Sequence, residues 1–362
     1  MEPGGTSSQA THRSRRPRGR RWNEERHAER SREVPRLRPP TDRAGPGDAA
    51  TMIELFKNPN YDFIGKRKWA YYVSIAFTLI GLTSLVAKGG LRYDIDFTGG
   101  TLVQVRFEQA PSVAQIRSSL STIHLGESVI QRFGDEREYI IRLPLAAASS
   151  EEVQKRVQSA LAAGGLGKFE IRRLEFVGPQ VGRDLQLQAV YLVLVGLVWI
   201  TIYIGLRFDL RGGVAAVIAV IHDVLVCLGA LSIMNREFSL PVLAALLTII
   251  GYSVNDTIVA YDRLRENRGK MVPKGRTFAD QMNDAVNQTL SRTILTSLTT
   301  FFSAAVLLFF GGKTLEDFAF VLFVGVITGT YSTTYVAAAI VVDWTRYVEG
   351  RLRRSKKAVA KA

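Results

Sequence analysis

Three ionisable residues lie inside or at the edge of segments that are otherwise apolar enough to cross a membrane. Asp256 lies near the end of one such segment, Asp223 near the middle of another, and Arg292 at the start of a third. A charged side chain in hydrocarbon costs about 2.5–3.5 kcal/mol even on the lenient insertion scale, so such residues commonly handle protons or ions. These positions predict a proton path inside a bundle of helices.

Neighbouring polar residues extend this hypothesis. Hydroxyl side chains follow Arg292 at spacings of three and four, which place them on one helix face: Thr296, Thr299, Thr300 and Ser303. We expect Thr296 to continue the path that Arg292 begins. We also expect Arg292 to hold the charged form of Asp256, because a fixed positive charge favours a carboxylate. Asn255 is expected to orient Asp256.

Structural roles remain open for each of these residues. Asp256 could form a buried ion pair or an interhelical hydrogen bond that only holds the bundle together. Asp223 follows His222, and the pair could simply bond to a neighbouring helix. Arg292 could extend its charged group to the membrane interface without any part in a path.

The elements that position these residues are six apolar blocks of membrane length. About 20 residues rising 1.5 Å each cross a hydrocarbon layer of about 30 Å, so each block suffices as a helix. The blocks are 69–87, 188–206, 213–233, 239–261, 293–310 and 318–342. The sequence therefore predicts an α-helical polytopic membrane protein with six transmembrane helices.

Basic residues predict the orientation of the bundle. They gather before the first block, between the second and third, between the fourth and fifth, and after the last. The connections after the third and fifth blocks hold only Arg236 and Lys313. The positive-inside rule then places both termini in the cytoplasm, with a cytoplasmic segment at 52–68 and a basic tail at 346–362. We attribute the net charge of +14 to this topology and expect no nucleic-acid partner.

The N-terminal residues 1–51 differ from the rest of the chain. They hold twelve Arg and seven acidic residues without apolar periodicity, which is typical of disorder. No apolar run precedes Trp69, so a cleavable signal peptide is not expected. Met52 is an alternative start, and the sequence leaves open whether the extension is translated. The single Cys227 and four His without ligand spacing predict no disulfide, metal or other cofactor.

Residues 88–187 form the one large hydrophilic segment between two apolar blocks, which the predicted topology places outside the cytoplasm. Apolar alternation, a capping box at Ser112–Gln115 and a hairpin signal at Gly134 predict the order β-α-β-β-α-β of a ferredoxin-like α+β domain. The expected strands are 92–107, 128–133, 138–143 and 169–177, and the expected helices begin at 112 and 149. No nucleophile–base pair stands out, so we expect a binding or mechanical module and no enzyme.

Four motifs in order resemble the SecD/SecF family of the resistance–nodulation–division superfamily. They are Asp94–Gly100, Val177–Gly182, Gly251–Asp262 and Ser291–Thr300, and the resemblance extends over residues 52–357. The first contains the family motif Asp96, Phe97, Thr98, Gly99 and Gly100. We expect it to start a strand in which the two glycines allow close backbone approach at a hinge.

The resemblance implies a Sec translocase accessory subunit in the bacterial cytoplasmic (inner) membrane. It implies that residues 188–345, with spans two to six, form an export domain, and that the six spans together are half of a pseudo-symmetric twelve-span unit. The implied partners are SecD, the SecYEG channel, unfolded preprotein and protons, with YajC and SecA as further candidates. The matching Arg of the family, here Arg292, is implied in proton transfer. The alternatives are a half-size proton-coupled exporter of the resistance–nodulation–division type and a passive scaffold.

Overall fold

The computed structural model describes residues 59–143, 150–269 and 275–359 of the chain. The predictions for residues 1–51, for a start at Met52 and for a helix cap at Ser149 lie outside these residues.

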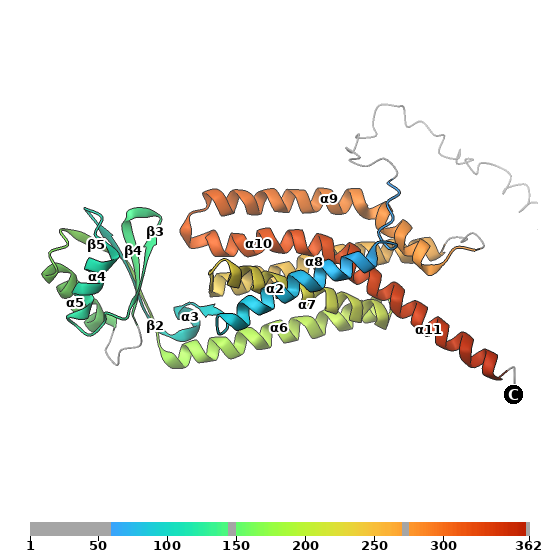
Figure 1. Cartoon of the computed structure of the whole chain (residues 1–362), viewed down its shortest axis with the longest axis horizontal. Coiled ribbons are helices and arrows are strands. Elements are labelled where there is room, and N and C mark those ends of the chain that lie inside the picture. The colour runs from blue at the N-terminus through green and yellow to red at the C-terminus, as the bar shows by residue number, and fades with distance from the viewer. Residues whose placement is uncertain (1–58, 144–149, 270–274, 360–362) are drawn as a thin grey trace, which may run out of the picture. The chain divides into compact units, whose positions relative to one another are not determined.

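Within this part of the chain, six helical segments are long and apolar enough to cross a membrane (Figure 1). They are α2 (Arg67–Ala87), α6 (Pro179–Arg207), α7 (Leu210–Ile233), α8 (Leu240–Gly269), α9 (Phe278–Phe310) and α10 (Lys313–Ser332), the last continuing through the π-helical η1 (Thr333–Ala337) into α11 (Ala338–Val359). The predicted class of a six-span helical membrane protein is confirmed.

The helices extend beyond the apolar blocks because polar residues cap and continue them. α9 begins well before the predicted Thr293, since Thr277 and Asp280 form a capping box there. α6 begins at Pro179, so the last residues assigned to the segment 88–187 already belong to this helix. The predicted tail 346–362 continues α11 as far as Val359.

Glycines allow the inner helices to pack closely. A Cβ atom on Gly81 of α2 would lie 2.8 Å from Cα of Gly229 on α7. A Cβ on Gly325 of α10 would lie 2.4 Å from Ile249, and one on Gly329 would lie 3.3 Å from Ser253. These small residues therefore set how closely α2, α7, α8 and α10 approach one another.

The hydrophilic segment forms the expected ferredoxin-like unit. Its four strands are β2 (Gly100–Phe107), β3 (Val129–Phe133), β4 (Asp135–Leu143) and β5 (Phe169–Val177), in the antiparallel order β3-β4-β2-β5. Two helices, α4 (Val113–Ser121) and α5 (Ser150–Ala163), cover one face of the sheet (Figure 1). Inward residues such as Val105, Ile141 and Leu161 form the core between these two layers. The capping box at Ser112 is present.

The predicted strand over residues 92–107, interrupted at Gly99 and Gly100, is present only in part. β1 (Arg92–Tyr93) is followed by one helical turn, α3 (Ile95–Thr98), before β2 begins. The side chain of Asp94 accepts a hydrogen bond of 2.7 Å from the backbone N–H of Ile95 and so begins the turn. β1 pairs instead with β6 (Glu237–Phe238), which lies between α7 and α8.

Candidate proton path and entry segment

Asp256 occupies a buried position on α8. Only 3% of the residue is exposed, and its Oδ2 atom has no hydrogen-bond partner among the residues that the structure describes. The charge of Arg292 on α9 acts on this carboxylate, although the two side chains form no ion pair. A buried acceptor without a partner is costly, and more so for a charged group. The site is therefore suited to a carboxylate that gains and loses a proton.

The predicted partners of Asp256 lie on outward faces of their helices. Arg292 and Thr296 are exposed, and the Thr296 hydroxyl donates a 3.0 Å hydrogen bond to the carbonyl of Arg292 on its own helix. Thr299 and Ser303 are likewise exposed and bond to their own helix. The hydroxyl stripe thus forms one helix face, as predicted, but it faces away from this chain's own bundle.

Asn255 does not orient Asp256 in this structure. Successive residues of a helix lie about 100° apart around its axis, and Asn255 is exposed whereas Asp256 is buried. No hydrogen bond joins the two side chains.

Asp223 is the centre of a satisfied polar cluster. It is 1% exposed, and its Oδ2 accepts hydrogen bonds of 2.7 Å from the hydroxyls of Ser253 on α8 and Ser332 on α10. Its Oδ1 lies 3.0 Å from Nδ1 of His222. Sequence reasoning found Asp223 but missed both serines. A sequence signal for Ser332 existed, because residues 330–334 are a run of five hydroxyl side chains inside an apolar segment. In the structure this run leads into the π-helical turn η1, and such turns often accompany functional sites.

Further hydroxyls connect α8 to α9 and α10. The Tyr252 hydroxyl donates to Ser297 at 3.1 Å, and Ser297 lies 2.7 Å from the hydroxyl of Thr330. One turn along α8, Thr257 lies 3.2 Å from the hydroxyl of Thr333. Hydroxyls both donate and accept hydrogen bonds, so chains of them can pass protons. Asp256 lies on the same stretch of α8 as the residues that begin these contacts.

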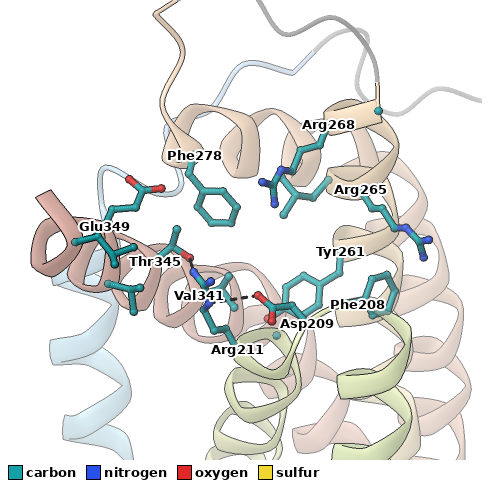
Figure 2. Close-up of a pocket in the computed structure, with 15 residues that line it drawn as sticks. Phe208, Asp209, Arg211, Tyr261, Arg265, Arg268, Phe278, Val341, Thr345 and Glu349 are labelled. Atoms are coloured by element: carbon teal, nitrogen blue, oxygen red, sulfur yellow. Dashed lines mark hydrogen bonds and ion pairs between the residues drawn. The ribbon is translucent and has the colours of Figure 1, made fainter. Parts of the chain in front are cut away.

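A cavity of about 610 Å³ lies where the ends of α8, α9 and α11 meet the connection from α6 to α7 (Figure 2). Tyr261 and Phe278 face it, and Asp209 lies 3.3 Å from Arg211 at its edge. Tyr261 follows Asp256 by little more than one turn of α8. In the described part of the chain, no group of His, Cys, Asp and Glu could hold a metal ion.

The segment Asp94–Gly100 lies at the entry to the α/β unit. Gly99 has φ 71°, and a Cβ on it would lie 3.1 Å from Cα of Pro179. Gly100 has φ 135°, and its Cβ would lie 2.8 Å from the carbonyl oxygen of Leu143. The predicted close backbone approach is therefore present, at the junction between the helical turn α3 and the first residue of β2.

Comparison with known proteins places these features in one class. The model of the protein export membrane protein SecD/SecF C-terminal domain matches residues 157–347, and the SecD/SecF GG motif matches residues 85–111. The first match covers more than half of the chain, and the chain therefore belongs to the SecD/SecF family of protein export membrane proteins.

Within this family the chain is similar to SecF subunits. It is 46% identical over 299 residues to the protein translocase subunit SecF of Desulfurispirillum indicum, covering 81% of this chain and 94% of that relative. It is 39% identical over 282 residues to SecF of Pseudomonas aeruginosa, covering 78% and 90%. The crystal structure of SecDF from Thermus thermophilus, described as a translocon-associated membrane protein, matches with a TM-score of 0.70 and 41% identity. That match covers 80% of this chain but 39% of the SecDF chain.

Proposed function

We propose that this chain acts with SecD to use the proton-motive force for preprotein movement through the SecYEG channel. The relatives named SecF support an accessory role in the Sec translocase. The main support for proton coupling is the position of Asp256. This residue is buried, one of its carboxylate oxygens has no hydrogen-bond partner among the described residues, and the charge of Arg292 acts on it. Protonation removes the cost of the buried charge, and deprotonation restores the attraction to Arg292.

The outward-facing polar residues of α9 support a proton path that runs along the interface with a partner protein. Arg292 and Thr296 are exposed on this chain, yet polar groups at membrane depth need protein or water around them. The SecDF chain is more than twice as long as its matching part, so it holds a second portion that could cover such a face. In our proposal SecD supplies that cover and closes the path.

The cavity at the ends of α8 and α9 supports access from one side. It opens between polar connections and reaches Tyr261, close to Asp256 along α8. In the proposed orientation both termini are cytoplasmic, and the cavity faces that side. Protons would then enter along the hydroxyl stripe and leave toward the cavity, with the Asp223 cluster contributing to the same hydrated path. SecA and YajC are further proposed partners. No feature of the described residues favours the exporter alternative.

Proteoliposomes with the chain, SecD, SecYEG and SecA test this function. Asp256→Asn keeps the shape and hydrogen bonding of the side chain but removes the titrating group. We expect it to abolish the stimulation of preprotein export by a proton gradient while assembly with SecD persists. Asp262→Asn is the matched control, because Asp262 lies on the same helix but is more than half exposed and pairs with Arg207. Normal stimulation in the Asp256→Asn vesicles would overturn the proposal.

A further inference from the structure

A partly buried cluster of charges joins the α/β unit to the helical bundle. Arg142 on β4 forms an ion pair through Nη1 with Glu237 of β6, and its Nε lies 3.4 Å from Oδ1 of Asp94. The three side chains are 16%, 12% and 19% exposed, respectively. We call Arg142, Asp94 and Glu237 the Arg142 cluster. Partly buried charges are screened less than fully exposed ones, so their pairing is stronger than that of surface ion pairs.

The cluster brings together three parts of the chain. Arg142 belongs to the sheet, where it pairs in register with Leu102 and Val129. Glu237 belongs to the connection between α7 and α8, and it also accepts a 3.3 Å hydrogen bond from Gln131. Asp94 caps α3, and its backbone N–H donates to the carbonyl of Phe238 at 3.0 Å. The sheet therefore contacts the bundle at the residues that immediately precede α8.

This contact supplements two covalent connections. The chain enters the sheet through residues 94–100 and leaves it through Gly178 into α6. Two connections alone would leave the unit an axis about which to rotate, whereas a third attachment restricts that rotation. The attachment is made to the start of α8, and Asp256 lies about 24 Å further along the same rigid helix.

Burial and charge make the attachment depend on an arginine at position 142. Burial raises the pKa of the Asp94 carboxyl, and the positive charge of Arg142 opposes this rise. Arg92 also faces Glu237, with its Nη2 atom 3.5 Å from Oε1 of that residue, but Arg142 is the cation that faces both carboxylates. Loss of Arg142 would therefore leave Asp94 without an ion-pair partner and Glu237 with Arg92 alone. Lys at this position would keep the charge but not the planar fork that reaches two carboxylates.

We propose that Arg142 is a positioning residue that fixes the α/β unit to the start of α8, so that movement of the unit and movement of α8 are transmitted to each other. This inference rests on the proposed function for its role in export. The physical attachment itself can be measured without export.

The first test is hydrogen exchange of the full chain in complex with SecD. Arg142→Gln should raise the exchange of backbone amides in residues 237–243 by about tenfold, as expected for the loss of one coupled buried contact. Arg172→Gln is the control, because Arg172 lies on β5 of the same sheet in an exposed pair with Glu170. Unchanged exchange in Arg142→Gln would overturn the attachment, whatever the result for Asp256→Asn.

The second test replaces the ion pair between Arg142 and Glu237 by a covalent cross-link. A chain with Cys227→Ala, Arg142→Cys and Glu237→Cys should lose most of its proton-gradient stimulation, and a short bifunctional thiol reagent should restore it at least in part. Arg142→Lys should retain intermediate stimulation. Normal stimulation before cross-linking, or no recovery after it, would overturn the coupling role. If Asp256→Asn also had no effect, the proposed function would fail separately, and the exchange result would still decide the attachment.

Discussion

The carboxylate of Asp96 accepts a 3.0 Å hydrogen bond from the backbone N–H of Leu240. Leu240 is the first residue of α8, so a residue of the entry segment satisfies one of the free N–H groups at the start of the helix that carries Asp256. A negative charge at this end also interacts favourably with the helix dipole. One aspartate of the family motif thus has a specific structural task.

Removal of this cap should destabilise the protein. Asp96→Ala should lower the free energy of unfolding by about 1 kcal/mol, a typical effect for a lost helix cap. Asp96→Asn keeps an oxygen acceptor and should cost only a few tenths of this, through the lost charge. Thermal unfolding of the purified chain measures both variants. Equal stability of Asp96→Ala and the parent chain would show that the bond contributes nothing.

Gly99 should tolerate a side chain less well than Gly134. Their φ angles are 71° and 69°, but a Cβ on Gly134 would meet nothing within 4 Å. Gly134→Ala should therefore cost only the backbone penalty of a positive φ, about 1–2 kcal/mol. Gly99→Ala should cost more, because its ψ of 165° lies in a region almost restricted to glycine and because its Cβ also presses against Pro179. Identical shifts in the midpoint of thermal unfolding would contradict this tighter constraint at Gly99.

The Asp223 cluster should contribute to stability as well as to the proposed path. Ser332→Ala removes one of the two hydroxyls that bond to Asp223, and we expect a loss of about 1–3 kcal/mol because the carboxylate is buried. Ser303→Ala is the matched control, since this exposed hydroxyl bonds only to the carbonyl of Thr299 on its own helix. Unfolding in detergent compares the two. A similar small loss of stability in both variants would show that the hydrogen bond from Ser332 to Asp223 contributes little to the free energy of unfolding.

The proposed orientation can be tested with cysteines on opposite ends. In a Cys227→Ala background, Glu151→Cys in the α/β unit should react with a membrane-impermeant maleimide. The reagent is added to spheroplasts, whose cytoplasmic membrane is intact. Arg351→Cys, an exposed position on α11, should react only after the membrane is opened. Labelling of both from the same side would refute the topology with cytoplasmic termini.

The sequence was sufficient wherever local pattern determines structure. Apolar length predicts the spans, and alternation with capping signals predicts the ferredoxin-like unit. The prediction failed at Ile95 and Phe97, whose alternation is typical of a strand. Here the cap by Asp94 and the positive φ of Gly99 favour one helical turn instead.

The candidate site was predictable in part for a different reason. Asp256 and Asp223 are recognisable because a carboxylate is rare in an apolar segment. Their surroundings depend on helix rotation and packing, which residue order alone does not determine. The outward position of Asn255 and the contact of Ser253 with Asp223 could therefore not be predicted. Arg142 and Glu237 are far apart in sequence, and each resembles an ordinary surface charge until the fold brings them together.

The outward face of α9 has a consequence for the amount of this protein that accumulates in a cell. A copy without a partner leaves Arg292 on an outward helix face, where lipid offers its charge no hydrogen bonds. We expect membrane proteases to degrade such a copy, whereas the pairing with SecD proposed above would cover this face. We therefore expect the steady-state amount of this chain to follow the supply of its partner, so that subunit stoichiometry is set by degradation of the excess and not only by matched synthesis.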